Sequence, residues 1–263
     1  MIPKPSIAKW REHAPWNTFE QVEQDLVISR ALIEIFSDDF LRENLAFRGG
    51  TALHKLYLNP APRYSEDIDL VQIKPGPIKP IMQHLNDVIT FFDEPRTTNL
   101  RGHGPKMYYR FMSEYEDIRL RLKIEINSKE HFNVLDWVEF PYAVNSDWFT
   151  GSTTIRTYNI HELLGTKLRA LYQRKKGRDL FDIDYSRLKL DLNTDQIITS
   201  FNEYMRFSTG HVPARREFEL NIAEKELDSD FTGDMEGLLR AGVAYDQAEA
   251  FVWISENIIE KLR

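Results

Sequence analysis

Two short segments of the chain carry the residues best suited to chemistry. Gly49-Gly50-Thr51 precedes an apolar helical pattern, and Ser65-Glu66-Asp67-Ile68-Asp69-Leu70 opens a strand-like run. Because side chains alternate along a strand, Asp67 and Asp69 leave the same face. Two carboxylates held this close need a cation between them, and hard oxygen ligands select Mg²⁺ or Mn²⁺. The pair therefore predicts a divalent metal site.

The glycine pair offers backbone N–H groups at the start of a helix, where phosphate groups bind. A tight turn that needs positive φ is the more frequent reason for two adjacent glycines. The segment is not a Walker A loop, because no Gly-Lys-Ser/Thr follows, and it lacks the third glycine of a Rossmann fingerprint. Combined with the acid pair, it indicates metal beside phosphate, as in phosphoryl or nucleotidyl transfer.

The alternative for Asp67 and Asp69 is a solvent-facing strand edge, where charges discourage aggregation. The apolar neighbours Ile68, Leu70 and Val71 favour a strand near the centre of the sheet, and hence metal ligation. Glu66 is expected on the opposite face, solvated or ion-paired.

A third carboxylate lies in the clearest strand of the chain. From Ile118 to Asn127 apolar and polar residues alternate, and Lys123 and Glu125 share the polar face. Glu125 becomes a metal ligand if this strand lies beside the aspartate strand. The competing interpretation is a solvated sheet face with a Lys–Glu ladder.

A lysine interrupts the apolar face of the helix expected at about 161–174. Lys167 falls within the stripe of Leu164, Leu168 and Leu171, where it either extends its ammonium to solvent or reaches a phosphate. It also begins a basic run without acids that could hold a triphosphate or an RNA backbone, or could be a solvated face. The run comprises Lys167, Arg169, Arg174, Lys175, Lys176 and Arg178.

Two acids follow this run three residues apart, which makes them neighbours on a helix surface. Asp179 fits a structural ion pair or a helix N-terminal acid. Asp182 could hold Lys167 or act as the base that deprotonates an attacking hydroxyl.

Composition narrows the function classes. The chain has 263 residues, a net charge of −7 and no cysteine, so disulfides, thiolate zinc sites and a cysteine nucleophile are excluded. The seven histidines show no metal-ligand spacing. No apolar run approaches membrane-spanning length and the N-terminus lacks the core of a signal peptide, so we expect a cytoplasmic protein without membrane contact. The acidic balance argues against indiscriminate coating of nucleic acid.

Periodicity predicts the elements that position these residues. Helices are expected at about 18–37, 51–58, 79–92, 161–174, 178–187, 194–206 and 243–262, and strands at 67–73, 107–112, 118–127 and 153–157. A strand-rich first half and an all-helical second half predict an α+β fold, with a core at 1–158 and a helical lobe at 159–263.

Four motifs in this order resemble the AbiEii/AbiGii toxin family, DNA polymerase β-like nucleotidyltransferases of bacterial toxin–antitoxin and phage-defence (abortive-infection) systems. The motifs are Phe47-Arg48-Gly49-Gly50-Thr51-Ala52-Leu53-His54-Lys55, Arg63-Tyr64-Ser65-Glu66-Asp67-Ile68-Asp69-Leu70, Glu162-Leu163-Leu164-Gly165-Thr166-Lys167-Leu168-Arg169-Ala170-Leu171 and Arg178-Asp179-Leu180-Phe181-Asp182. They span residues 47–182, about half of the chain.

The resemblance implies a bilobed protein, with a mixed-sheet nucleotidyltransferase core and a helical lobe, that uses Mg²⁺ and a nucleoside triphosphate. Several relatives add nucleotides to the 3′ end of tRNA and so stop translation, and a winged-helix antitoxin is encoded alongside. One departure is a glycine-to-aspartate gap longer than usual, with the turn at Pro60–Pro62 as the insertion.

The family's functional residues map onto this chain one by one. Gly49, Gly50 and Thr51 match the glycine motif, Asp67 and Asp69 the metal-binding pair, Ser65 the preceding serine and Lys167 the essential lysine at the triphosphate. Asp182 matches the later catalytic acid, with Asp179 as the alternative. Lys55, Ser65 and Arg174 are expected to contact the nucleotide as well. Glu125 as the third metal ligand rests mainly on strand geometry.

The leading hypothesis is therefore a Mg²⁺-dependent nucleotidyltransferase with an RNA acceptor, and the resemblance favours tRNA. Within it, a protein or small-molecule acceptor remains open. A metal-dependent nuclease is a second hypothesis, although the order Lys123-x-Glu125 reverses the Glu-x-Lys pattern of such enzymes. A degenerate nucleotidyltransferase that only binds a partner is the third.

Overall fold

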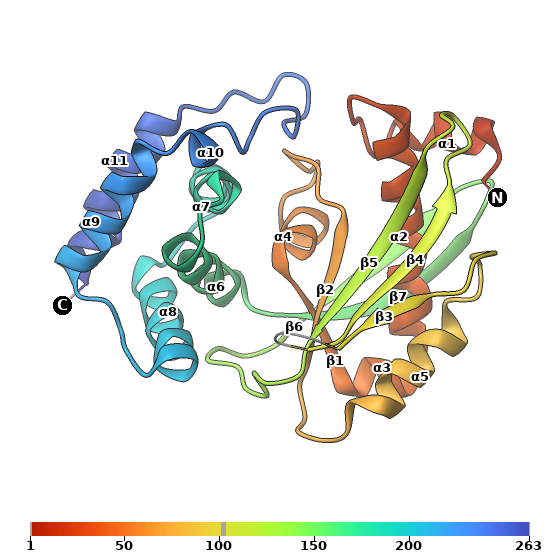
Figure 1. Cartoon of the computed structure of the whole chain (residues 1–263), viewed down its shortest axis with the longest axis horizontal. Helices are drawn as coiled ribbons and strands as arrows, with labels where there is room; N and C mark the ends of the chain where they lie inside the picture. The colour runs from red at the N-terminus through yellow and green to blue at the C-terminus, as the bar shows by residue number, and fades with distance from the viewer. Residues whose placement is uncertain (1, 101–103, 263) are drawn as a thin grey trace. The chain divides into compact units, whose positions relative to one another are not determined.

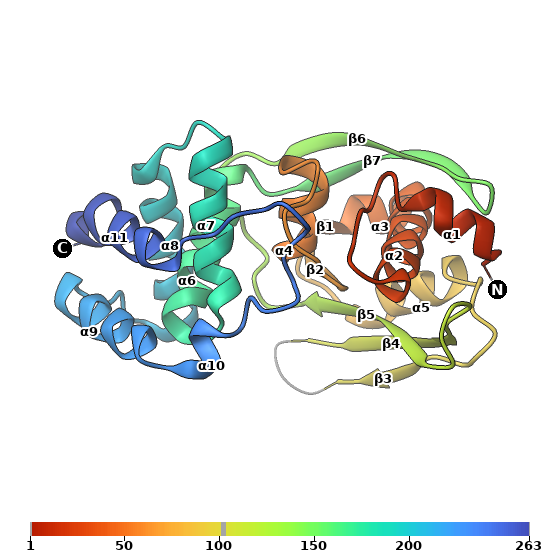
Figure 2. The ribbon, with the colours of Figure 1, turned by 90° about the horizontal axis from the view of Figure 1, so that it is seen from above.

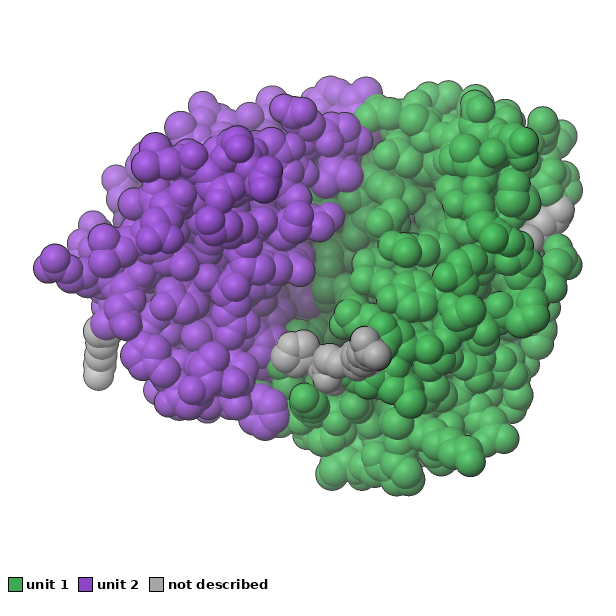
Figure 3. All heavy atoms as spheres, in the orientation of Figure 1, with its two compact units in different colours: residues 1–132, 137–158 green, residues 133–136, 159–263 purple. Residues whose placement is uncertain are grey.

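A computed structural model describes residues 2–100 and 104–262 of the chain. The chain divides into two compact units, coloured separately in Figure 3: residues 1–132 with 137–158, and residues 133–136 with 159–263. No helix in the described ranges combines the length and the apolar character needed to cross a bilayer.

The first unit is built on one mixed sheet. In the described part of the chain it has seven strands in the order β3-β4-β5-β2-β1-β7-β6 (Figure 1). These are β1 (Leu45–Arg48), β2 (Asp67–Gln72), β3 (Thr97–Asn99), β4 (Lys106–Met112), β5 (Arg119–Asn127), β6 (Val138–Asn145) and β7 (Thr150–Thr157). β2 pairs antiparallel with β1 and parallel with β5, which places it inside the sheet.

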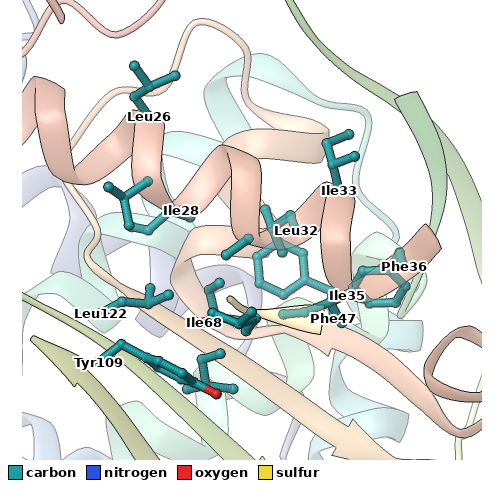
Figure 4. Packing of buried hydrophobic residues seen from close by; sticks show 14 of the residues in the cluster. Leu26, Ile28, Leu32, Ile33, Ile35, Phe36, Phe47, Ile68, Tyr109 and Leu122 are labelled. Carbon is teal, nitrogen blue, oxygen red and sulfur yellow. The ribbon is translucent and has the colours of Figure 1, made fainter. Parts of the chain in front are cut away.

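Helices cover one face of this sheet. They are α1 (Lys4–Trp10), α2 (Phe19–Ser37), α3 (Asp39–Asn44) and α5 (Ile78–Val88). In Figure 2 both ends of the sheet, β6–β7 and β3–β5, curl around this group of helices. Leu32 and Phe36 of α2 pack with Ile68 of β2 in a continuous buried core (Figure 4). The opposite face of β2, β4 and β5 carries their polar residues.

The long helix α2 begins at a capping box. The Thr18 hydroxyl accepts a hydrogen bond from the Gln21 N–H, and the Gln21 side chain accepts one from the Thr18 N–H. These bonds satisfy N–H groups that a helix start leaves without partners. The predicted helix at 18–37 is confirmed.

The helix that carries the glycines differs from the prediction. α4 (Gly49–Ala52) is a single turn, and the chain continues as a π-helical segment, η1 (Leu53–Tyr57), instead of an α-helix to residue 58. In this wider turn the Lys55 ammonium lies 3.0 Å from both carboxylate oxygens of Asp25.

Asp25 of α2 is a buried junction for three segments. Its oxygens also accept hydrogen bonds from the indole N–H groups of Trp10, at 3.0 Å, and Trp16, at 3.2 Å. Burial lowers the pKa of Lys55, but Asp25, with a smaller contribution from Tyr142, outweighs this effect, so the pKa lies above its ordinary value. The lysine therefore stays charged, and Asp25 ties the N-terminal segment to the segment that follows the glycines.

The second unit is helical. Its helices are α6 (Ile160–Gln173), α7 (Gly177–Lys189), α8 (Thr194–Thr209), α9 (Arg215–Glu226), α10 (Ser229–Thr232) and α11 (Gln247–Asn257), followed by a 3₁₀ turn, η2 (Ile259–Lys261). Gly165 lets α6 and α8 approach closely, because a Cβ there would lie 2.6 Å from Cβ of Ser200. Buried Glu162 of α6 accepts hydrogen bonds from the N–H groups of Val134 and Leu135, which attaches residues 133–136 to this unit.

The α+β class is confirmed, and several details differ. The helix predicted at 79–92 ends at Val88, and the one predicted at 243–262 is α11 plus η2. Ile118, expected on the buried face of its strand, precedes β5 and is 44% exposed. The edge strand β6 was not predicted. It contains Pro141, which an edge strand tolerates because the N–H group that proline lacks can face solvent instead of a neighbouring strand.

We expect Asp25→Ala to destabilise the protein by about 3–5 kcal/mol, because the buried Lys55 ammonium would lose its counter-charge. Urea unfolding followed by tryptophan fluorescence measures the loss. Asp39→Ala, which breaks an exposed pair with Arg42, is the control and should cost less than about 1 kcal/mol. Equal losses in the two variants would contradict the role given to Asp25.

Candidate active site

Asp67 and Asp69 leave the same face of β2, as predicted. Both are partly buried, whereas Ile68 and Leu70 between and after them are fully buried in the core. Because β2 lies between β1 and β5, the edge-strand interpretation of these acids is wrong. Glu66, expected to be solvated or ion-paired, precedes the strand and is exposed.

The strand that carries Glu125 is the neighbour of β2. In the parallel register of β2 and β5, Asp67 is opposite Lys123 and Asp69 is opposite Glu125. The strand of Glu125 thus lies beside the aspartate strand, which was the condition for Glu125 to reach the acid pair. In the antiparallel register of β4 and β5, Lys106 is opposite Glu125, so a second ammonium joins the same face.

Two ammonium groups contact these carboxylates. Lys123 Nζ lies 2.6 Å from Asp67 Oδ2 and 3.5 Å from Glu125 Oε2. Lys106 Nζ lies 3.2 Å from Glu125 Oε1. Among the described residues, no three acidic or histidine side chains converge closely enough to hold a metal ion. The cations that form ion pairs with Asp67 and Glu125 in the described ranges are these two lysines.

The positive charge does not fully balance the acids at Asp69. Burial raises the pKa of Asp69, and the negative charges of Asp67 and Glu125 raise it further, while Lys123 and Arg48 oppose the rise. At Lys123, burial lowers the pKa, but the hydrogen bond and charge of Asp67 outweigh it and raise the value overall. A further cation at this face would relieve the repulsion, so oxygen ligands and electrostatics both suit a hard divalent ion.

The glycine motif packs directly against the acid pair. Gly49 has φ 80°, and a Cβ at this position would lie 2.2 Å from Asp69 Oδ2. The residue is therefore required both for the backbone conformation and for the close approach to Asp69. Gly50 is buried in α4.

Thr51 and Ser65 brace the backbone at the first aspartate. The Thr51 hydroxyl donates to the carbonyl oxygen of Asp67 at 2.6 Å and lies 2.8 Å from the Ser65 hydroxyl. Lys55, expected at the nucleotide, is instead bound by Asp25 and Ser29 of α2, each at 3.0 Å.

In the second unit the structure brings Lys167 together with both later acids. Its ammonium lies 2.8 Å from Asp182 Oδ2 and 3.2 Å from Asp179 Oδ1, and both aspartates are fully buried. Arg174 donates to both oxygens of Asp179, at 2.6 and 2.8 Å. Burial raises the pKa of Asp179, but Lys167 and Arg174 outweigh it and hold the pKa below its ordinary value.

The basic run is not an isolated positive patch, which corrects the sequence interpretation. Lys175 pairs with Asp228 at 2.7 Å, and Lys176 and Arg178 pair with Asp234 at 3.3 and 3.6 Å. The Arg169 guanidinium lies over the Tyr204 ring, 5.0 Å from its centroid. The neutralising aspartates come from about fifty residues later in the chain, so a local sequence window could not reveal them.

Two site residues were not singled out from sequence. Lys123 was noted only as a neighbour of Glu125, although its position two residues earlier on the same face was a usable signal. The sequence contains no comparable signal for Lys106, because its proximity to Glu125 arises from the register of β4 and β5.

Comparison with known proteins agrees with this geometry. The sequence profile described as "Nucleotidyl transferase AbiEii toxin, Type IV TA system" matches residues 30–257. No protein in the curated set matches the chain in sequence.

Solved structures show a similar fold. The nucleotidyltransferase toxin MenT4 from Mycobacterium tuberculosis superposes with a TM-score of 0.70 at 15% identity, over 98% of this chain and 90% of that one. JHP933 from Helicobacter pylori gives a TM-score of 0.57 at 17% identity, over 93% of this chain and 94% of that one. At such identities the likeness concerns the fold alone.

The raised pKa of Asp69 predicts a pH-dependent effect of Asp69→Asn. The folded protein binds the Asp69 proton more tightly than the unfolded chain does, so ionisation of Asp69 costs stability as the pH rises through the raised pKa. We expect the stability of Asp69→Asn relative to the wild type to increase as the pH rises above about 4, the ordinary pKa range of a carboxyl group, in urea unfolding. Glu66→Gln, at a neighbouring acid that is exposed to solvent, is the matched control. A pH-independent difference for Asp69→Asn would refute the assignment.

Proposed function

The chain belongs to the AbiEii family of nucleotidyltransferase toxins of type IV toxin–antitoxin systems, and we propose that it transfers a nucleotide from a nucleoside triphosphate to an RNA acceptor. The acceptor we propose is the 3′ end of tRNA, whose modification blocks translation. The observation that carries the proposal is the acid pair on the inner strand β2, with Glu125 beside it and Gly49 packed on Asp69. Membership of a type IV system implies an antitoxin partner.

We propose that Asp67, Asp69 and Glu125 hold Mg²⁺ or Mn²⁺. When bound, such an ion stabilises negative charge on phosphate oxygens and lowers the pKa of a coordinated hydroxyl. The carboxylates share one sheet face, and the pKa of Asp69 is raised first by its burial and then by the negative charges of Asp67 and Glu125. Thr51 and Ser65 keep the backbone at Asp67 in place through their hydroxyl groups.

The second unit contributes the remaining proposed roles. We assign residues 1–158 to the catalytic core and 159–263 to a helical lobe, in which Lys167 and Arg174 bind the triphosphate and Asp182 is the later catalytic acid. Both cations are bound to buried aspartates, so contact with a triphosphate requires each to give up part of that pairing. Asp179, bound by both cations, is the residue that orients them.

The biological setting follows from the proposed acceptor. A tRNA target places the toxin in the cytoplasm, and the antitoxin we expect is a winged-helix protein encoded nearby. A role in phage defence would follow from the abortive-infection relatives that the sequence motifs resemble.

One observation favours a second candidate. Lys123, Asp67 and Glu125 lie together on one face, which is the residue set of a metal-dependent nuclease. Incubating RNA with Mg²⁺ but no triphosphate separates the two, because a nuclease still cleaves whereas a nucleotidyltransferase leaves the RNA intact. The close packing of Gly49 on Asp69 has no role in the nuclease mechanism. Transfer to a protein or a small molecule is tested by offering each as acceptor in place of RNA.

Asp67→Asn should reduce label transfer from nucleoside triphosphate to tRNA by at least about 100-fold, because it removes a charge that binds the catalytic cation. The assay incubates the protein with each labelled triphosphate and total RNA and sizes the labelled product. Glu66→Gln, one residue away and exposed, is the matched control and should keep full activity. Full transfer by Asp67→Asn would end the assignment.

Lys123→Met should tighten Mn²⁺ binding roughly fivefold, because the ammonium on Asp67 competes with the ion for the same oxygen. Electron paramagnetic resonance of unbound Mn²⁺ measures this affinity without reference to catalysis. Arg121→Met removes one charge from the same face of β5 and has no acidic partner among the described residues, so it controls for net charge.

Equal tightening in Lys123→Met and Arg121→Met would show a general charge effect and contradict competition at Asp67. Lys106→Met then tests Glu125, the only acid that Lys106 contacts in the described part of the chain. Tightening beyond the Arg121→Met control supports Glu125 as a ligand.

A further inference from the structure

The polar face of β4 and β5 continues beyond the acid pair as a basic and aromatic surface. In the antiparallel register Tyr108 is opposite Lys123, and Arg110 is opposite Arg121. Alternate residues of both strands, such as Tyr109 and Leu122, are buried in the core on the other face. Residues directly opposite each other share a face, so Tyr108, Arg110 and Arg121 lie on the face that carries Asp67 and Glu125.

Arg110 and Arg121 form an unusual cross-strand pair. Like charges directly opposite each other destabilise a sheet. Neither guanidinium forms an ion pair with an acid in the described ranges: Arg110 donates to the Thr97 hydroxyl at 2.8 Å, and Arg121 lies over the Tyr108 ring, 5.5 Å from its centroid. An anion between the two guanidinium groups would relieve this repulsion. The basic run of the second unit differs, because Lys175 and Lys176 are already neutralised by aspartates.

The position of this pair connects it to the acid site. Same-face residues of a strand are about 7 Å apart, so Arg121 is one such step from Lys123 and about two from Glu125. Lys123 in turn contacts Asp67. A chain of phosphates running along β5 would thus pass from the arginine pair to the acids.

We propose that Tyr108, Arg110 and Arg121, here termed the acceptor strip, bind the single-stranded end of the RNA acceptor. The inference rests on the proposed nucleotidyl transfer and names where its acceptor lies. Guanidinium groups pair with phosphates in a bidentate manner, and an unpaired base stacks on a tyrosine ring next to an arginine. A duplex would keep its bases stacked on one another and could not use the ring, so the strip selects a single strand.

The test compares two double variants that each remove two positive charges. Arg110→Gln/Arg121→Gln changes the acceptor strip, and Lys175→Gln/Lys176→Gln changes the neutralised run. Binding of a labelled single-stranded oligoribonucleotide and of total tRNA is measured by fluorescence anisotropy across a salt series, without triphosphate. We expect the strip variant to bind at least about tenfold more weakly, with a salt slope reduced by about 1.4, or about 0.7 for each lost phosphate contact.

The control variant should bind within about twofold of the wild type under the same conditions. Thermal unfolding of the strip variant should match or exceed that of the wild type, because the substitutions remove a like-charge pair from a solvent-facing surface. A fluorescent triphosphate should bind both double variants equally. Weaker RNA binding by the control, or unchanged RNA binding by the strip variant, would overturn the inference.

Substitutions of Tyr108 test the contribution of base stacking to RNA binding without changing the charge of the acceptor strip. Tyr108→Thr keeps strand propensity but removes the ring, and it should weaken oligoribonucleotide binding roughly tenfold. Tyr108→Phe keeps the ring and should bind as the wild type does. Equal losses in both variants would exclude stacking and overturn this part of the inference.

Failure of the strip and failure of the proposed function have different signatures. If the wild type labels RNA and the strip variants label it equally well, the transfer activity stands and the strip is wrong. If the wild type binds RNA through the strip but labels a protein or a small molecule instead, the strip stands and the RNA acceptor is wrong. If the wild type binds no RNA at any salt concentration, both are wrong.

Discussion

Mutual repulsion among Asp67, Asp69 and Glu125 is the constraint on which the first unit depends. Three carboxylates on adjacent inner strands are costly to bury, and the raised pKa of Asp69 expresses that cost. The fold offsets part of it with two lysines that enter from β4 and β5. Lysine is suited to this task because its ammonium is mobile on a long stem and leaves the carboxylate oxygens accessible to a harder cation.

The neighbouring elements hold the acids in position without neutralising them. Gly49 allows α4 to approach the Asp69 carboxylate closely, and Thr51 holds the backbone of Asp67 from the same turn. Lys55, in the turn that follows, is bound to buried Asp25, which two tryptophans also bind. The glycine motif is therefore anchored on one side by the acid pair and on the other by the helical layer, so its geometry is set before any nucleotide binds.

The sequence predicts what depends on local pattern and not what depends on tertiary pairing. Alternation identified the shared face of Asp67 and Asp69 and the polar face of Glu125, and the capping residues located the start of α2. The order of the strands in the sheet cannot be predicted from local pattern. The role of Glu125 therefore depended on a pairing of β2 with β5 that the sequence could not establish. The pairing of Lys55 with Asp25 depends on a π-helical turn that no propensity signals. The neutral character of the run after Lys167 depends on Asp228 and Asp234, which only the folded chain brings near.

The acid cluster on β2 and β5 differs from the acid pair of the second unit in how far its charge is balanced. In the second unit Asp179 and Asp182 are fully buried and share Lys167, with Arg174 also bound to Asp179, so local charges are nearly balanced and the pKa of Asp179 is lowered. In the first unit the acids exceed their partners at Asp69, while on the same sheet face Arg110 and Arg121 have no acidic partner in the described part of the chain. A cluster of paired charges stabilises a fold by itself. Unpaired negative groups in one place and unpaired positive groups in another are stabilised only by ligands of opposite charge. A metal ion at the acids and a phosphate backbone at the arginines would supply both, and for this reason we propose the polar face of β2, β4 and β5 as the functional surface of the first unit.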